Sequence, residues 1–575
     1  MKLNGSQVVI ECLIEQGVDK VFGYPGGAIL NIYDELYKNS NRIEHILTAH
    51  EQAAAHAADG YARSTGKVGV CMATSGPGAT NLVTGIATAY MDSSPVVAIT
   101  CNVPTVLLGK DSFQEIDITG ITMPVTKHNF MVHDIKDLAQ IIREAFVIAK
   151  SGRPGPVLID IPKEVTSPSN FVEFEPLKKA DDSIALIEGT KTNMHRVLHA
   201  AVPADEEIKV AADLINAAER PVIYAGGGVV ISSAEKELLE LAEKCDIPVS
   251  ESLMARAAFP SSHRLCTWMV GMHGTKASNR AITESDLIIA LGARFSDRVI
   301  SNPGKFAVNS KILHIDIDPA EINKNIPTAA SLVGDVKAVL DRLLPLLQKK
   351  TRPDWDAKIA DWKAEHPSSY DVQPEHSINP KFICEYVHKV AGDNAFITTE
   401  VGQHQMWVAQ YYPFNVPRTF VTSGGLGTMG FGTGAAIGIQ CALPKARVVH
   451  IAGDGSFRMN CNELATIQHY NLPIVIVVVN NGALGNVRMW QHLFYGERYS
   501  QTTLNFGPDW LKLAEAYGIQ GYRAGNADEF EKAFDAAFAS GKAAVIDAKV
   551  DIDEMVLPMV PGGKPIYEQI MNLGE

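Results

Sequence analysis

A short polar motif, Gly453-Asp454-Gly455-Ser456, carries the clearest chemistry in the chain, and Asn481 follows Asp454 by 27 positions. A carboxylate and an amide oxygen are hard ligands of the kind that Mg²⁺ prefers. Glycines let backbone N–H groups approach an anionic oxygen closely. Gly-Asp-Gly alone is also typical of a surface turn before a helix, so the elements around the motif decide between the two interpretations.

Both parts of this motif follow an apolar run of strand length. Residues 447–451 precede Asp454, and residues 473–479 precede Asn481. In open parallel sheets, ligands bind beyond the carboxyl ends of the strands. The order strand, Gly-Asp-Gly-Ser, helix, strand, Asn therefore predicts one site for Mg²⁺ and a diphosphate at the edge of a sheet.

This stretch resembles the diphosphate-binding fingerprint of thiamine-dependent enzymes, and the resemblance extends along nearly the whole chain to the large catalytic subunit of acetohydroxyacid synthase (acetolactate synthase). So many long motifs in one order make coincidence negligible, whereas each short motif alone is only a hypothesis. The stretches that carry the resemblance are VFGYPGGA (21–28), HEQAAAHAADGYAR (50–63), TSGPGATN (74–81), SGRPGPVLIDIPK (151–163), GMHGT (271–275), GARFSDR (292–298), HIDIDP (314–319), VGQHQMW (401–407), SGGLGTMGFG (423–432) and MNCNELAT (459–466).

Alternating strand and helix signals divide the chain into three α/β blocks. Further strand runs are expected at residues 68–74, 95–101, 156–161, 221–225, 287–291, 312–317 and 395–399. The resemblance implies three doubly wound parallel-sheet domains of the thiamine-diphosphate enzyme type. We expect a pyrimidine-binding domain (1–165), a central FAD-binding-like domain (195–345), a diphosphate- and Mg²⁺-binding domain (379–550) and a C-terminal tail (551–575). Residues 168–194 and 346–378 are expected to be linkers, the second carrying a helix.

In the third block the resemblance assigns Mg²⁺ to the side chains of Asp454 and Asn481 and to the backbone carbonyl of Ala483. Met429 resembles the bulky residue that holds thiamine diphosphate in its bent conformation, although a lone methionine is more often a core residue. The other positions expected to bind the cofactor there are Val401, Gly402, Gln403, His404, Gly453, Gly455, Ser456 and Gly485.

In the first block, Glu51 opens a predicted helix, where a glutamate is ordinarily only a favourable partner of the helix dipole. The resemblance gives it the role of hydrogen-bonding the aminopyrimidine ring, which makes the exocyclic nitrogen a base. In the family, Glu51 of one subunit meets Asp454 of another, so a homodimer or homotetramer is implied. The other positions expected around this half of the site are Pro25, Gly26 and Gly76 at the cofactor, Gln114 and Phe113 in the wall, and Lys163 in an access channel, where an exposed loop lysine is the plainer interpretation.

The second block contains Gly226-Gly227-Gly228 after a strand, but without the GxGxxG spacing of a dinucleotide loop. The resemblance implies that this block binds FAD, which takes no redox part in the main reaction. The positions that resemble its contacts are His273, Gly274, Arg294, Asp316 and Asp335.

Two residues are expected to recognise the second substrate. Arg298 resembles the arginine that receives the carboxylate of the acceptor, since a guanidinium can bind a carboxylate bidentately. Without the resemblance it would be a surface arginine paired with Asp297. Trp490 resembles the tryptophan that favours 2-oxobutanoate over pyruvate, with limited selectivity because one methylene is worth about 1–3 kcal/mol.

Several positions depart from the commonest pattern of the family. Asn102 and Met123 stand where glutamine and arginine are frequent, and Asn486 replaces a methionine. These changes leave the acceptor preference open. The remaining departures are Ser296, Met489 and the pair Thr433-Gly434, which replaces Leu-Pro.

Composition excludes several other classes of protein. The net charge of −14 argues against a general surface for nucleic acid or anionic membranes. No apolar run reaches the length needed to cross a membrane, and the first residues lack the pattern of a signal peptide. The eight cysteines are scattered without a CxxC pair, as expected in a reduced cytoplasm.

The expected activity is that of acetolactate synthase, which decarboxylates pyruvate and joins the two-carbon fragment to a second 2-oxo acid. Pyruvate as acceptor gives 2-acetolactate, and 2-oxobutanoate as acceptor gives 2-aceto-2-hydroxybutanoate. This reaction is the first common step toward branched-chain amino acids. Thiamine diphosphate, Mg²⁺, FAD and a small regulatory subunit are expected. The alternatives are another thiamine enzyme (a pyruvate oxidase, a decarboxylase or a glyoxylate ligase), a flavin or nicotinamide oxidoreductase, and a non-catalytic binding protein.

Overall fold

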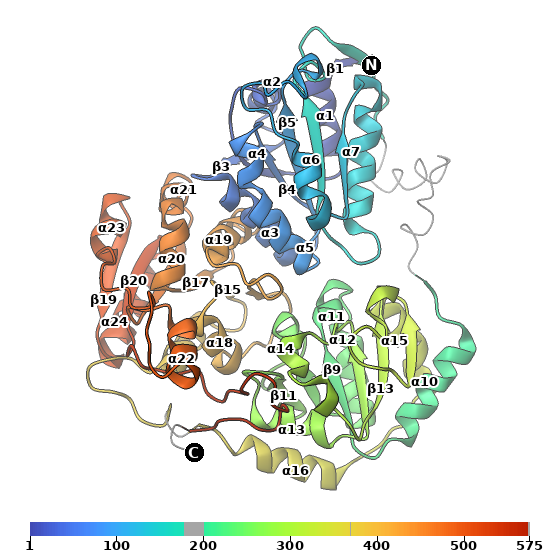
Figure 1. The fold of residues 1–575 in the computed structure, drawn as a ribbon, viewed down its shortest axis with the longest axis vertical. Helices are drawn as coiled ribbons and strands as arrows, with labels where there is room; N and C mark the ends of the chain where they lie inside the picture. The colour runs from blue at the N-terminus through green and yellow to red at the C-terminus, as the bar shows by residue number, and fades with distance from the viewer. Residues whose placement is uncertain (178–200, 368–369, 573–575) are drawn as a thin grey trace.

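The computed structural model describes residues 1–177, 201–367 and 370–572, and this part of the chain forms three parallel sheets of six strands each (Figure 1). The inner strands of each sheet, such as β4, β12 and β18, are buried along all or nearly all of their length, which is typical of parallel sheets covered by helices on both faces. The expected fold class is thus confirmed, and each strand run expected from the sequence is a strand. Residues 178–194 of the first expected linker and 195–200 of the central domain lie outside the described residues.

The first sheet, blue in Figure 1, has the strand order β3-β2-β4-β5-β7-β6. Its strands are β2 (Lys20–Tyr24), β3 (Glu44–Leu47), β4 (Gly69–Ala73), β5 (Val96–Asn102), β6 (His128–Met131) and β7 (Val157–Pro162). Its helices are α1 (Gly5–Glu15), α2 (Leu30–Lys38), α3 (Glu51–Thr65), α4 (Pro77–Asn81), α5 (Val83–Met91), α6 (Ile118–Thr122) and α7 (Ile135–Lys150). The chain order reverses between β2 and β4, which makes the space beyond these two strands the place for a ligand.

A small antiparallel pair closes this domain. β1 (Lys2–Asn4) pairs with β8 (Phe171–Glu173), which lies beyond residue 165, where we expected the domain to end. Phe174 packs into the core of the same domain. The first core therefore draws on residues from the stretch expected to be a linker.

The third sheet, at the red end of the chain, repeats the topology of the first. Its order is β16-β15-β17-β18-β20-β19, so both sheets read 2-1-3-4-6-5 when strands are numbered within the domain. Its strands are β15 (Phe396–Thr399), β16 (Phe420–Val421), β17 (Val448–Gly453), β18 (Ile474–Asn480), β19 (Gln520–Ala524) and β20 (Ala544–Lys549). Its helices are α17 (Pro380–Ala391), α18 (Gln403–Tyr411), α19 (Phe431–Ala442), α20 (Asp454–Asn460), α21 (Leu464–His469), α22 (Gly485–Phe494), α23 (Trp510–Ala516) and α24 (Ala527–Ser540). Its switch point lies between β15 and β17.

The central sheet, green in Figure 1, has a different order, β11-β10-β9-β12-β13-β14. Numbered within the domain this is 3-2-1-4-5-6, the order of dinucleotide-binding domains, with its switch point between β9 and β12. The strands are β9 (Pro221–Ala225), β10 (Val249–Glu251), β11 (Cys266–Met269), β12 (Leu287–Leu291), β13 (Lys311–Asp316) and β14 (Ala330–Val333). The helices are α10 (Asp205–Ala217), α11 (Gly227–Ile231), α12 (Glu235–Cys245), α13 (Lys276–Glu284), α14 (Asp297–Ile300) and α15 (Val336–Leu343), followed by α16 (Pro353–Lys363) in the second expected linker.

The first and third domains meet along helices α3 and α19 (Figure 1). Small residues let the two backbones approach closely. A Cβ on Gly438 would lie 1.9 Å from the carbonyl oxygen of Ala57, and one on Gly434 would lie 2.9 Å from that of Ala53. The glycine of the unusual pair Thr433-Gly434 is therefore required by this contact.

The expected C-terminal tail runs back along the central domain. The N–H of Val560 donates to the carbonyl of Met272, and Nδ2 of Asn279 donates to the carbonyl of Ile566, at 2.8 and 3.0 Å. Within the described ranges, no helix has the length and apolar character that a membrane span requires.

Candidate active site

The first half of the candidate site lies at the switch point of the first sheet. The loop after β2 carries Pro25 and Gly26, and the turn after β4 carries Gly76. A Cβ on Gly26 would lie 2.4 Å from Cγ2 of Thr74, so the two loops are in direct contact. The N–H of Ala28 also donates to Oγ1 of Thr74 at 3.2 Å.

Glu51 joins this group from the first turn of α3. Its Oε2 accepts a hydrogen bond of 2.9 Å from Nδ2 of Asn81, the last residue of α4. Gln114 lies against the turn after β4, because a Cβ on Gly76 would be 2.9 Å from Cβ of Gln114. The structure therefore brings together Glu51, Gln114 and the two glycine-containing loops, as the sequence predicts.

The second half lies at the switch point of the third sheet. Gln403 opens α18 after β15, Asp454 opens α20 after β17, and Asn481 follows β18. Nδ2 of Asn481 donates to Oε1 of Gln403 at 2.9 Å, and Nε2 of Gln403 donates to the carbonyl of Glu554 at 2.8 Å. Oδ1 of Asn481 accepts the N–H of Ala483 at 3.1 Å.

The surroundings of Asp454 fit a bound cation. The residue is buried, and its Oδ1 has no hydrogen-bond partner among the described residues. Burial raises the pKa of Asp454 to about 7, only partly offset by backbone N–H groups and Arg458. A buried carboxylate oxygen without a partner is unfavourable, and a divalent cation shared with Asn481 would satisfy it.

His404 and the glycines beside it form a narrow cradle. A Cβ on Gly453 would lie 2.8 Å from Nδ1 of His404, so the first glycine of the Gly-Asp-Gly-Ser motif packs on the imidazole. Burial lowers the pKa of His404 to about 4, which keeps the ring neutral, and its Nε2 is buried without a partner in the described part of the chain. A neutral ring with a free nitrogen is suited to hydrogen-bond a phosphate oxygen.

The remaining predicted residues surround these groups. A Cβ on Gly485 would lie 1.9 Å from Oε1 of Gln403, and Oγ of Ser456 donates to the carbonyl of Gly453 at 3.2 Å. The carbonyl oxygen of Ala483 lies 3.8 Å from the Cβ position of Gly455. Met429, Gly402 and Val401 lie on the loops before α19 and α18, which follow the neighbouring strands β16 and β15.

The two halves remain separate within one chain. Among the described residues, no hydrogen bond or ion pair joins the group around Glu51 to the group around Asp454. One link between the domains close to Glu51 is the N–H of Ala49, which donates to Oε2 of Glu463 at 3.0 Å.

A cavity of about 1010 Å³ extends between all three domains. It begins at the switch point of the central sheet, where Gly226 and Gly228 approach Gly292 so closely that a Cβ on either would overlap its backbone. This close approach explains the run of glycines, although their spacing is not GxGxxG. The volume and the strand order fit a dinucleotide such as FAD.

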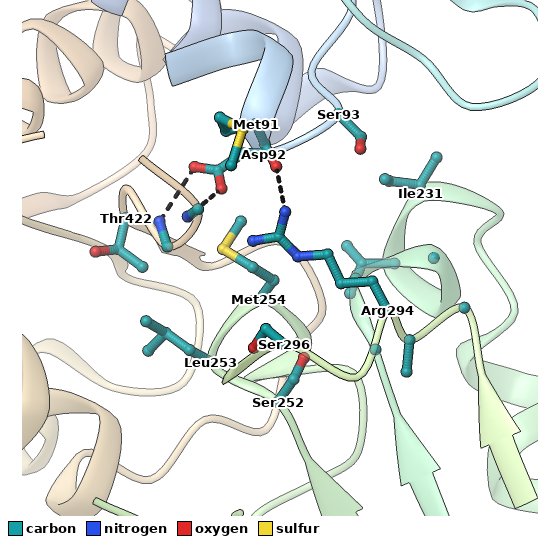
Figure 2. A pocket seen from close by; sticks show the side chains of 18 of the residues that line it. Met91, Asp92, Ser93, Ile231, Ser252, Leu253, Met254, Arg294, Ser296 and Thr422 are labelled. Atoms are coloured by element: carbon teal, nitrogen blue, oxygen red, sulfur yellow. Dashed lines mark hydrogen bonds between the residues drawn. The ribbon is translucent and has the colours of Figure 1, made fainter. Parts of the chain in front are cut away.

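Four of the five residues expected to contact FAD line this cavity: His273, Arg294, Asp316 and Asp335. Nη1 of Arg294 donates to the carbonyl of Met91 at 3.3 Å, as Figure 2 shows. Nδ1 of His273 is buried without a partner among the described residues. The side chain of Asp335 also caps α15 by accepting the N–H of Ala338 at 3.0 Å.

Gly274 has a different place. It does not belong to the lining of this cavity, and its carbonyl accepts Nε2 of Gln569 from the C-terminal tail at 2.8 Å. Lys163 lies exposed beyond β7. Arg298, Trp490 and Asn486 line the end of the cavity near α22, and the side chain of Arg298 is 63% exposed.

Asp92 is a residue that sequence reasoning missed. It directly follows α5, its side chain is fully buried, and it accepts the N–H groups of Gly424 and Gly425 at 3.1 and 2.6 Å (Figure 2). Nη2 of Arg63 donates to it at 2.9 Å. No residue spacing in the sequence could reveal the contact with Gly424 and Gly425, because more than 300 residues separate them from Asp92.

Comparison with known proteins agrees with this geometry. Three family profiles match the chain: "Thiamine pyrophosphate enzyme, N-terminal TPP binding domain" over residues 3–121, the "central domain" over 208–343, and the "C-terminal TPP binding domain" over 400–548. The acetolactate synthase large subunit of Mycobacterium tuberculosis is 48% identical, covering 98% of this chain and 90% of its own length. The isozyme 3 large subunit of Escherichia coli K12 is 43% identical over 98% of this chain and 97% of its own length.

The chain belongs to the acetolactate synthase large subunits. The first and third domains of the chain match the two thiamine pyrophosphate binding domains of these enzymes. The large subunit of Haemophilus influenzae extends the same similarity, with 43% identity over 99% of this chain.

Proposed function

We propose that this acetolactate synthase family member decarboxylates pyruvate and joins the two-carbon fragment to a second pyruvate or to 2-oxobutanoate. The observation that carries the proposal is the buried Asp454, whose Oδ1 has no hydrogen-bond partner among the described residues, at the switch point of a domain that matches a thiamine pyrophosphate binding domain. When bound, thiamine diphosphate supplies an electron sink: it stabilises the electron pair that remains when the bond to CO₂ breaks.

The residues of the third domain would hold the diphosphate end of the cofactor. Asp454, Asn481 and the carbonyl of Ala483 would bind Mg²⁺, and His404 would donate to a phosphate oxygen. The hydrogen bond from Asn481 to Gln403 fixes the amide, whose Oδ1 accepts the N–H of Ala483.

Glu51 would hold a proton at the aminopyrimidine ring. Its Oε2 is already oriented by Asn81, so the carboxyl group can hydrogen-bond a ring nitrogen with its other oxygen. Because Glu51 and Asp454 are not joined within one chain, we propose a homodimer or homotetramer in which each site takes one half from each subunit.

The end of the cavity near α22 would bind the acceptor. The guanidinium of Arg298 would receive its carboxylate, and the ring of Trp490 would contact the extra methyl of 2-oxobutanoate. FAD would occupy the part of the cavity between Gly228 and Arg294, as a structural group.

We also propose a small regulatory subunit as a partner, because the relatives are called large subunits. A cytoplasmic location is supported by the eight cysteines, which are all unpaired. Neither nucleic acid nor a membrane is proposed as a partner, given the net charge of −14.

Product analysis tests the proposal. The purified protein is incubated with pyruvate, thiamine diphosphate, Mg²⁺ and FAD, with and without 2-oxobutanoate. We expect acetolactate, with a shift toward acetohydroxybutyrate when 2-oxobutanoate is added. Acetaldehyde or peroxide as the only product would contradict the acceptor site, and activity without thiamine diphosphate would contradict the whole proposal.

A further inference from the structure

Glu400 is a fully buried carboxylate between β15 and α18. It accepts hydrogen bonds from the N–H of Gly430, from the N–H of Thr433 at 3.2 Å and from Oγ1 of Thr433 at 3.3 Å. These N–H groups belong to the N-cap and the first turn of α19, and the N-cap, Gly430, has no side chain to satisfy them. Glu400 therefore caps α19 from another part of the chain and places a negative charge at the positive end of the helix.

His450 completes the polar group around this carboxylate. Its Nε2 lies 3.4 Å from Oε1 of Glu400 and 3.3 Å from Oγ1 of Thr433, and its Nδ1 lies 2.9 Å from Oγ1 of Thr398. The ring lies over Gly432, where a Cβ would be 2.4 Å from Cε1. Burial raises the pKa of Glu400, but the hydrogen bond with His450, the neighbouring His404 and the N–H of Thr433 together outweigh it, so the pKa falls below its usual value.

A second contact holds the same backbone from the other side. Nδ2 of Asn460 donates to the carbonyl of Gly430. Asn460 is the last residue of α20, which begins at Asp454. Gly430 has a φ of 85°, in the left-handed region that favours glycine. Both polar groups of this residue are thus held by buried side chains, and Met429 is its neighbour in the chain.

We propose that Glu400 is a positioning residue for Met429: by fixing Gly430 and the first turn of α19, it sets the place of the side chain that supports thiamine diphosphate. This rests on the proposed function. Thr433, which stands where the family commonly has leucine, adds a hydrogen bond from Oγ1 to the one that its backbone N–H makes with Glu400. The hydroxyl contact is therefore specific to the threonine of this chain, whereas any residue would supply the N–H.

The first measurement is the dissociation constant of thiamine diphosphate with Mg²⁺, taken by quenching of protein fluorescence. Glu400→Gln keeps the shape of the side chain but removes its charge, so we expect binding about tenfold weaker. The KM for pyruvate should stay unchanged, since Glu400 contacts only the protein. Glu251→Gln is the matched control, because Glu251 is equally buried and paired with Arg256 in the central domain; it should leave cofactor binding unchanged.

A double-mutant cycle separates positioning from general stability. If Glu400 acts through Met429, the variant Met429→Ala/Glu400→Gln should bind the cofactor as Met429→Ala does, within about twofold. The same tenfold loss in both backgrounds would overturn the proposal, as would unchanged binding in Glu400→Gln alone. Should Glu400→Gln not fold, Thr433→Val removes one donor and serves the same cycle, with a loss of about threefold expected.

These outcomes are distinct from failure of the proposed function. A wild-type protein that does not bind thiamine diphosphate would contradict the function itself. If the wild-type protein binds thiamine diphosphate but the effects of Glu400→Gln and Met429→Ala on binding are additive, only the proposed role of Glu400 is contradicted.

Discussion

Asn481 and Gln403 are 78 residues apart in the chain, and their side-chain amides share a hydrogen bond of 2.9 Å. Asn481 donates from Nδ2, so its Oδ1 is turned toward the N–H of Ala483 and has a second lone pair for another partner. The contact ties the loop after β15 to the loop after β18, on either side of the strand that leads to Asp454. It therefore orients an expected Mg²⁺ ligand before any metal binds.

We expect Gln403→Leu to weaken Mg²⁺ binding by about tenfold, because outer-shell partners of metal ligands are typically worth 10–100-fold. The measurement is the Mg²⁺ concentration that half-restores activity to the metal-free protein. Gln440→Leu is the control, since Gln440 is equally buried but binds backbone carbonyls at the far end of α19. Equal Mg²⁺ dependence in both variants would show that the amide contact does not orient Asn481.

Glu51→Gln should lower kcat by at least about 100-fold, since it removes the carboxyl group expected to hold a proton at the aminopyrimidine ring. Flavin content and thermal midpoint should stay near those of the wild type. Asn81→Leu removes only the hydrogen bond that orients Glu51, so a loss of about tenfold is expected. Wild-type turnover of Glu51→Gln would contradict the role of this residue.

Gly228→Ala should yield protein without flavin. Its Cβ would lie 2.6 Å from Cα of Gly292, so the two loops at the central switch point must separate. The flavin absorbance of the purified protein measures the effect. Gly562→Ala is the control, because nothing lies within 4 Å of a Cβ there; full flavin content in both variants would place the flavin elsewhere.

Trp490→Leu should shift the products toward acetolactate when pyruvate and 2-oxobutanoate compete. One methyl contact is worth about 1–3 kcal/mol, so the preference for 2-oxobutanoate should fall roughly tenfold. The ratio of the two products gives the result. Trp362→Leu, outside the lining of the cavity, should leave that ratio unchanged, and an unchanged ratio in Trp490→Leu would exclude the ring from the acceptor site.

His56 should make the contact between α3 and α19 sensitive to acid. Burial lowers its pKa from 6.5 to about 4, so between these values the folded protein binds fewer protons than the unfolded chain. The free energy of unfolding should fall as the pH drops from 6.5 toward 4, by up to about 3 kcal/mol. His56→Leu should make the denaturation midpoint fall less steeply across this range, with the dependence from His45, His273 and His404 remaining because burial also lowers their pKa values to about 4. His376→Leu, at an exposed position, should leave the steepness unchanged.

Much of the fold and one set of site residues could be predicted from the sequence. Apolar runs of strand length mark β9 and β12 with the bounds that the structure has. Asp454 and Asn481 were predicted because each directly follows such a run, and the carboxyl ends of parallel strands share one edge of the sheet. Signals of this kind depend only on neighbouring residues, so they can be recognised in the sequence without knowing the tertiary contacts.

The sequence by itself determined the residue types and the strands that present them. Tertiary structure alone decided which of these residues meet: Asp92 with Gly424, Glu400 with Gly430, and three domains around one cavity. It also placed Gly274 against the C-terminal tail instead of the cavity. The physical reason is that such contacts join backbone N–H and C=O groups to side chains from distant elements, and a backbone group is the same at every position, so no residue pattern records its partner.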